Sequence, residues 1–212
     1  AKAFGLSYIG VTYHTKALAM TSGLDEKALR RQGKKIDQLN QKLRGFRILK
    51  STECDILKDG SLDLHDDVLK TLDLVTVSVH SHFTLSKKEM TERIIRAIKH
   101  PLVNVLLHPT GRMVGRREPY EVDMNQVIRA AKEYNVALEI YGSERLDLHE
   151  QYISQCLEVG TKLVVNSDAH NPSHFAEHLD HGVAQARKGW ATKADILNTK
   201  PLKAFLAALK KK

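Results

Sequence analysis

Short apolar runs alternate with amphipathic segments along this chain of 212 residues. The runs are rich in β-branched and other apolar residues, which is typical of strands in a buried sheet. There are six, and they cover residues 7–13, 46–56, 72–80, 102–108, 136–142 and 161–167. The pattern therefore predicts six strands.

The segments between these runs carry apolar residues at helical spacing, as Met90, Ile94, Ile95 and Ile98 illustrate. The predicted helices cover residues 25–44, 87–100, 124–135 and 149–160, with a closing helix from about Pro201. Alternating strands and helices predict a parallel sheet with helical crossovers. No glycine-rich nucleotide-binding loop is present, so we expect a (β/α) barrel, formed by residues 1–212 as a single domain.

The first residues, AKAFGLSYIG, predict the last turn of a helix, a stop at Gly5 and then a strand. The chain also begins at Ala1, without an initiator methionine. We therefore expect that the domain is truncated at its N-terminus.

Composition adds limits on partners and compartment. The net charge is +8, and a basic surface attracts polyanions such as nucleic acid. The two cysteines, Cys54 and Cys156, lie far apart and form no spaced motif, which favours a reducing cytoplasm. We expect no membrane span, because no apolar stretch is long enough, and no signal peptide is visible.

Imidazole and carboxyl groups lie within or just after the predicted strands. They are His14, Glu53, His80, His108, Glu139, Asp168 and His170. Chemistry in α/β barrels sits at the carboxyl ends of the strands, so these groups should converge. Buried groups of this kind cost free energy unless they are paired or bound to metal. The cluster predicts a site for Zn, Mn or Fe, and a shared carboxylate could bridge two ions.

The chain holds further histidines outside this group. His82 is undecided, because it lies close to His80 but can point the other way along its strand. The remaining histidines are predicted to be surface or capping residues: His65, His100, His149, His174, His178 and His181.

The loop HPTGRMVGRREPY places Arg112, Arg116 and Arg117 just beyond His108. Guanidinium groups bind phosphate oxygens in pairs, so these arginines are predicted to contact phosphate or DNA.

Longer stretches of the chain resemble a known family. They are GLDEKALRRQ, ECDILKDGSLD, LDLVTVSVHSHF, EMTERIIRAI, HPTGRMVGRREPYEVDM, RLDL, VNSDAH and GVAQARKGW…DILNT. The chain resembles the PHP (polymerase and histidinol phosphatase) phosphoesterases, and more narrowly the C-terminal PHP domain of bacterial family X DNA polymerases. The resemblance spans essentially the whole chain. It implies a distorted (β/α)7 TIM-like barrel, lacking its first strand in this chain, with up to three metal ions, Mn²⁺ or Zn²⁺.

The resemblance also implies ligand roles. Glu53 matches the bridging carboxylate, with His80 and His108 as its partners on a second metal. Asp168 matches a ligand of the first metal, while His14 and His170 match ligands of the third. Two departures stand out. The family's opening H-x-H strand has no counterpart here, and Tyr13 and Tyr141 replace the usual residues of T-D-H and E-I-N.

In the polymerase context the resemblance implies a metal-dependent 3′–5′ exonuclease that processes single-stranded or gapped DNA ends in repair, with a polymerase core upstream. Its catalytic residues would be Glu53, His80, His108, Asp168 and His170. Two alternatives stay open: an inactive PHP module that binds DNA or supports a polymerase, and a phosphomonoesterase of the histidinol phosphatase type.

Overall fold

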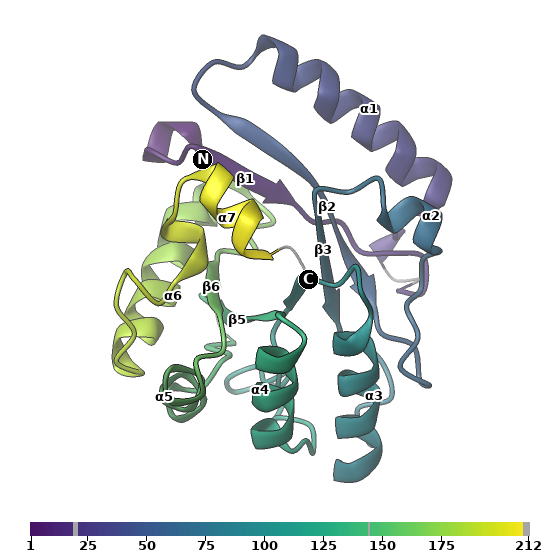
Figure 1. Ribbon diagram of the computed structural model, residues 1–212, viewed down its shortest axis with the longest axis vertical. Coiled ribbons are helices and arrows are strands. Elements are labelled where there is room, and N and C mark those ends of the chain that lie inside the picture. Colours follow the sequence, from purple (N-terminus) through teal and green to yellow (C-terminus); the bar gives the residue numbers. More distant parts are fainter. Residues whose placement is uncertain (19–20, 144, 210–212) are drawn as a thin grey trace.

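A computed structural model describes residues 1–18, 21–143 and 145–209. Its centre is one sheet of six parallel strands that follow each other in chain order. The strands are β1 (Tyr8–Val11), β2 (Arg47–Asp55), β3 (Leu74–Ser78), β4 (Val105–Leu106), β5 (Ala137–Tyr141) and β6 (Leu163–Asn166). The sheet curves into a half-barrel with helices between its strands (Figure 1). The predicted α/β fold and all six predicted strands are confirmed.

Seven α-helices are found among the described residues. They are α1 (Glu26–Lys42), α2 (Asp66–Leu69), α3 (Lys87–Lys99), α4 (Met124–Glu133), α5 (Glu150–Val159), α6 (Phe175–Lys188) and α7 (Leu202–Leu209). The amphipathic pattern predicted five of these and missed α2 and α6. Ser86 and Glu89 form a capping box that begins α3, and Gly160 ends α5 in a left-handed conformation. None of the described helices has the length and apolarity needed to cross a bilayer.

Alternate side chains along each strand enter two different apolar clusters. Val75, Leu106 and Leu138 point outward and pack with the helices that cover the convex face. Their neighbours Leu74 and Val105 point inward and belong to a second cluster. This alternation follows from the two-residue period of a strand.

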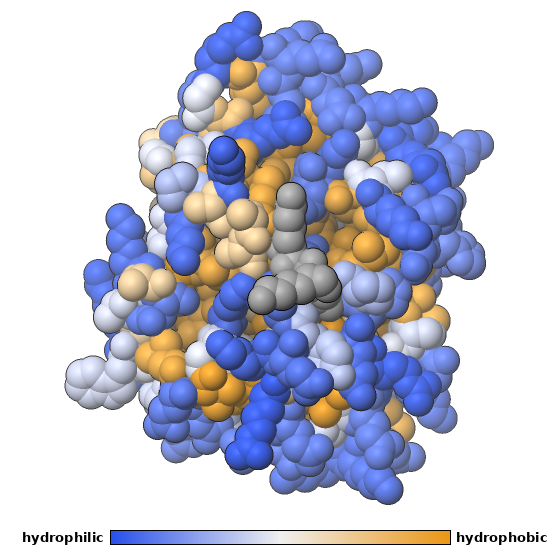
Figure 2. Space-filling model, in the orientation of Figure 1, coloured by the Kyte–Doolittle hydropathy of each residue, from blue (hydrophilic) through white to orange (hydrophobic). Residues whose placement is uncertain are grey.

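Helix α7 closes the inner cluster. Its residues Phe205 and Leu209 are buried against the inward side chains of the strands, and the Phe205 ring stacks on Tyr8 with centroids 5.3 Å apart. In Figure 1, α7 (yellow) lies above and to the left of the centre of the view, between β1 and β6, and Figure 2 shows apolar residues near the centre of this face with hydrophilic residues around its edge. The amino-terminal half of the inner face is therefore filled by packing, which leaves the other half for chemistry.

The first turn is as the sequence predicts. Lys2–Phe4 form one turn of 3-10 helix, and Gly5 follows it with a φ of 79°. Glycine adopts this left-handed conformation without the steric cost of a Cβ atom.

Candidate metal centre

The inner face of the sheet changes from apolar to polar along the strands. On β2, Leu49 is followed two and four residues later by Ser51 and Glu53. On β5, Ala137 is followed in the same way by Glu139 and Tyr141. Because side chains two residues apart share a face, the carboxyl ends of these strands place polar groups side by side. This is the edge at which the sequence predicted a site.

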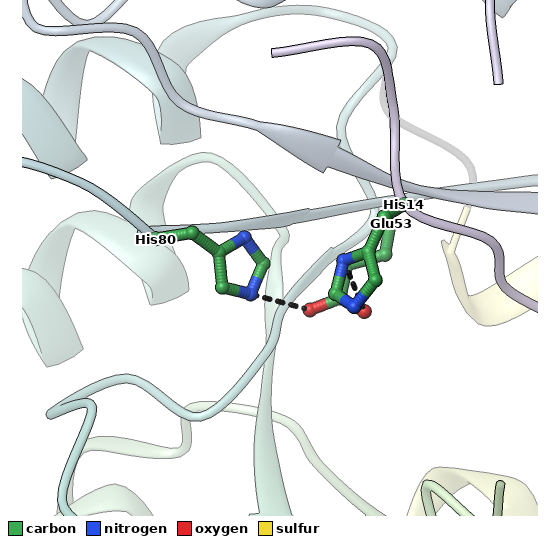
Figure 3. Close-up of side chains that lie close together, drawn as sticks. All are labelled: His14, Glu53 and His80. Atoms are coloured by element: carbon green, nitrogen blue, oxygen red, sulfur yellow. Dashed lines mark ion pairs between the residues drawn. The ribbon is translucent and has the colours of Figure 1, made fainter. Parts of the chain in front are cut away.

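Three imidazole rings converge on the carboxylate of Glu53, which is only 3% exposed. His108 Nε2 lies 3.0 Å from Glu53 Oε1, and His80 Nε2 lies 3.2 Å from the same oxygen. His14 Nδ1 lies 3.3 Å from Oε2. Figure 3 shows the rings of His14 and His80 directed at this carboxylate. The structure thus brings four predicted residues together, and we call His14, Glu53, His80 and His108 the imidazole cluster.

Asp55 orients one ring of the imidazole cluster. Its Oδ1 atom lies 3.0 Å from His80 Nδ1, on the side of the ring opposite Glu53. When a carboxylate accepts a hydrogen bond from one ring nitrogen of a neutral histidine, the other nitrogen is left without a proton and is available as a metal ligand. Asp55 is buried, and sequence reasoning did not single it out. The signal was its position two residues after Glu53, on the same face of β2.

Burial and pairing shift the pKa values of these groups. Burial opposes ionisation of Glu53, but hydrogen bonds from His108 and His80 outweigh it and hold its pKa well below the ordinary value. Burial lowers the pKa of His80, but Asp55 and Glu53 outweigh it and raise the pKa to about 9. Burial dominates at His14 and lowers its pKa. The low pKa of Glu53 therefore leaves a negative carboxylate at the centre, which attracts positive charge.

The donor set of the imidazole cluster fits a divalent metal. One ligand atom from each of His14, Glu53 and His80 lies within 4.8 Å of the others, which allows them to share one ion. Mixed imidazole and carboxylate ligands suit Zn²⁺ and Mn²⁺. His108 Nδ1 is also buried without a hydrogen-bond partner among the described residues, so its ring orientation is not fixed from behind as that of His80 is.

The backbone is strained at two predicted ligands. His108 has a φ of 28° and Asp168 a φ of 40°. Positive φ angles are uncommon for residues other than glycine, and they cluster at functional sites. In both cases the strand has just ended, and the turn directs the side chain into the site.

The carboxyl ends of β5 and β6 are arranged differently. Tyr141 donates a hydrogen bond from its hydroxyl to Asp168 Oδ2 at 2.8 Å. Burial raises the pKa of Glu139 to about 8, and its two oxygens accept from the Asn166 side chain and the His108 backbone. Glu139 therefore fixes the backbone at His108 and does not face the imidazole cluster as a ligand.

The other predicted site residues lie around the rim. His170 is exposed, and its Nδ1 lies 3.0 Å from the backbone oxygen of Asp168. His82 is exposed and lies outside the imidazole cluster. The ligand roles of Asp168 and His170 stay predictions, because their side chains are not among the groups that gather on Glu53.

The predicted phosphate-binding arginines contact the protein's own backbone. Arg112 donates to the carbonyl oxygens of Arg145 and Leu146, at 3.1 and 2.5 Å. Arg117 donates to the oxygen of Gly111 at 2.8 Å, and its guanidinium lies 4.3 Å from the ring centroid of Phe83. The side chain of Arg116 is exposed. Their contacts with phosphate or DNA stay predictions.

Helix α6 and the turn before it bring two histidines to the site. The sequence analysis placed both of them on the surface or at helix caps. His174 and His178 line a pocket of about 440 Å³ that also contains the imidazole cluster, together with Arg145. The helix approaches the end of β5 closely, because a Cβ atom on Gly142 would lie 1.7 Å from the backbone oxygen of His178. The missed signal was the pair of glycines, Gly142 and Gly182, which permits this approach. His174 is exposed and lies at the start of α6, as predicted for a surface or capping residue, whereas His178 is half-buried against the site, so the surface prediction is corrected for His178.

Other histidines are surface or capping residues as predicted. His149 accepts from the backbone of Gln151 at the start of α5, and His181 is exposed.

Comparisons with known proteins place this arrangement in context. No family model matches the chain. Over 208 residues, 98% of its length, it is 41% identical to the DNA polymerase/3'-5' exonuclease PolX of Bacillus subtilis (strain 168). That match covers 36% of the polymerase, so the chain corresponds to a minor part of it.

A second relative is shorter. The chain is 31% identical over 187 residues to a probable phosphatase of Thermoanaerobacter sp. (strain X514), a match that covers 82% of the chain and 74% of the phosphatase. Among solved structures, it is similar to the histidinol phosphate phosphatase of Lactococcus lactis subsp. lactis Il1403, determined with zinc, L-histidinol and phosphate. The TM-score is 0.63 at 17% identity, with 88% of this chain and 83% of the other covered, which shows a shared fold.

Proposed function

Because this chain belongs to the PHP family, we propose that it is a metal-dependent phosphodiesterase that shortens DNA from the 3′ end. The observation that carries the proposal is the convergence of three imidazoles on buried Glu53 at the carboxyl ends of parallel strands. The match to a polymerase with exonuclease in its name, along 98% of the chain, supports DNA as the substrate. The net charge of +8 also favours a polyanion.

The residues at the site have separate roles in such a reaction. His14, Glu53, His80 and His108 would hold the metal, with Mn²⁺ or Zn²⁺ as the candidates. A divalent ion held there would supply Lewis-acid polarisation of a phosphate oxygen and would acidify a bound water. Asp55 keeps Nε2 of His80 directed at the shared centre.

Asp168 and His170 complete the proposed catalytic set, on the β6 side of the pocket. Asp168 is available to hold a proton or a second ion once the Tyr141 hydroxyl turns away. Three ions, as the family resemblance implies, would require this change, so we propose that one ion binds first at the imidazole cluster.

We also propose that Arg116 and Arg117 contact DNA at the rim, and that a polymerase core in a longer protein delivers the DNA end in the cytoplasm during repair. The relative's greater length supports a polymerase partner, because this chain matches 36% of it.

A phosphomonoesterase is the second candidate. The probable phosphatase is matched over 74% of its length, and the pocket of about 440 Å³ has the size of small-molecule sites. Such an enzyme would cleave a phosphate monoester and leave internal DNA linkages intact.

The deciding experiment is digestion of a 5′-labelled single-stranded oligonucleotide with Mn²⁺ or Zn²⁺ present, with a phosphate monoester tested in parallel. Stepwise shortening from the 3′ end, lost in His108→Ala, is the expected result. Hydrolysis of the monoester alone would support the second candidate. No hydrolysis of either substrate by a metal-loaded protein would leave the inactive DNA-binding module.

A further inference from the structure

Arg145 lies on the wall of the pocket that contains the imidazole cluster. Its Nη1 atom is buried and has no hydrogen-bond partner among the described residues. A buried guanidinium nitrogen without an acceptor costs free energy, and native structures rarely leave such donors unused. An acceptor that arrives with a ligand would explain why the donor is kept.

The position of Arg145 is fixed from both sides. Arg112 donates to the backbone oxygens of Arg145 and Leu146, which fastens the loop after β5 to the loop after β4. The Arg145 guanidinium lies 5.3 Å from the ring centroid of Tyr141, within the range of a cation–π contact. Tyr141 in turn donates to Asp168. The guanidinium is therefore held at the site before any ligand binds.

The surroundings of Arg145 favour an anion. Burial, and then the positive charge of Arg145, lower the pKa of Arg117, so these two cations lie close enough to repel each other. The imidazole rings of His174 and His178 line the same pocket and can act as hydrogen-bond donors to an anion. Anions are bound where positive groups are held together, and guanidinium binds phosphate oxygens with strong, directed hydrogen bonds.

We propose that Arg145 binds the phosphate group on which the imidazole cluster acts, as the anion-recognition residue of the pocket. This rests on the proposed function, since it assumes a phosphate ester as substrate. It also divides the arginines of the site by role: Arg112 positions the loop, and Arg145 contacts the ligand. The same contact would serve a DNA phosphodiester or a small phosphate monoester.

The test is binding of inorganic phosphate, measured by isothermal titration calorimetry with and without Mn²⁺. Arg145→Met removes the charge and keeps a long side chain, and Arg145→Lys keeps the charge without the paired donors. Arg129→Met is the matched control, because Arg129 is exposed on α4. Circular dichroism and metal content are measured for each variant.

The expected result is a loss of phosphate affinity of roughly tenfold or more in Arg145→Met, a smaller loss in Arg145→Lys and none in Arg129→Met. The metal content stays at the wild-type level in all three. If Arg145→Met does not fold, the comparison of Arg145→Lys with wild type decides.

Three results would overturn the proposal. They are equal phosphate affinity in wild type and the Arg145 variants, no phosphate binding by wild type in either form, and an affinity loss that is accompanied by loss of metal. Failure of the proposed function gives a different result. If the wild-type protein binds phosphate through Arg145 but hydrolyses no ester, the anion site is supported and the proposed hydrolytic activity is contradicted.

Discussion

The two sides of the pocket solve the same electrostatic problem in different ways. On the β1–β4 side, the imidazole cluster surrounds Glu53 with three rings that can serve as metal ligands. On the β5–β6 side, the carboxylate of Asp168 is satisfied by a hydroxyl group of Tyr141 at 2.8 Å. A phenol with a raised pKa keeps its proton, so it caps the carboxylate as a neutral donor.

The difference between the imidazole cluster and Asp168 indicates which side of the pocket binds metal first. A protonated imidazole such as that of His80, whose pKa is raised to about 9, gives up a proton when it becomes a metal ligand, and this exchange costs little when the ion brings its own charge. The tyrosine must instead move away before Asp168 can bind an ion. We therefore expect an ordered filling of the pocket, starting at Glu53.

The largest effect should come from Glu53→Gln. The change removes the only negative charge among the four residues of the imidazole cluster, so metal content should fall to background and hydrolysis by at least about a hundredfold. Metal analysis after gel filtration measures the metal content. Glu139→Gln is the matched control, because burial raises the pKa of Glu139 to about 8 and leaves it largely neutral at pH 7. Equal metal loss in both variants would contradict the distinction between these two buried carboxyl groups.

Asp55→Asn should come next. The neutral amide removes the negative charge that favours the His80 ring with Nδ1 protonated, and a change of this kind in the partner of a metal-binding histidine lowers metal affinity by about 10- to 100-fold. Competition with a chromogenic chelator gives the affinity. Asp59→Asn serves as a control, because Asp59 accepts hydrogen bonds from the backbone and hydroxyl of nearby Ser61 and lies outside the imidazole cluster. Unchanged affinity in Asp55→Asn would show that the ring is oriented by other contacts.

The metal-free protein should lose stability as the pH rises. The folded state raises the pKa of His80 from its ordinary 6.5 to about 9. This contribution is fully present below pH 6.5 and is lost on rising through pH 9, because only the folded state stays protonated between these values. The slope for one proton is at most about 1.4 kcal/mol per pH unit. Urea unfolding across this range in chelator should show the decline in wild type and a flatter profile in His80→Asn; equal profiles would contradict the pairing.

Tyr141→Phe should have the smallest effect on the imidazole cluster and a specific effect opposite it. The ring that supports Arg145 is kept, but Asp168 loses its donor and becomes free to bind cations. The first metal should bind as in wild type, while binding of further ions becomes tighter. A titration followed by metal analysis would show this as a change in stoichiometry alone. Weaker binding of the first ion would mean that the two sides are not independent.

The sequence predicted the sheet well, because apolar runs and amphipathic segments alternate and the strand ends carry unusual groups. The four members of the imidazole cluster could be found from their positions at strand ends. Helix α6 could not, because its path depends on the close approach of Gly142 and Gly182, which no periodic pattern reveals.

The roles of the arginines were also beyond the sequence. Arg112 and Arg145 belong to the loops after different strands, and only their contact shows that one holds the backbone of the other. Asp55 was overlooked for a related reason. Its function depends on the direction of the His80 ring, which is a property of packing across β2 and β3.

The most direct test of the account is an anomalous-scattering map from crystals of this chain grown with Mn²⁺ or Zn²⁺. We predict the strongest peak between His14, Glu53 and His80, with any peak near Asp168 weaker or absent at low metal concentration. A strongest peak at Asp168, or no peak beside Glu53, would contradict the assignment of the imidazole cluster as the metal centre.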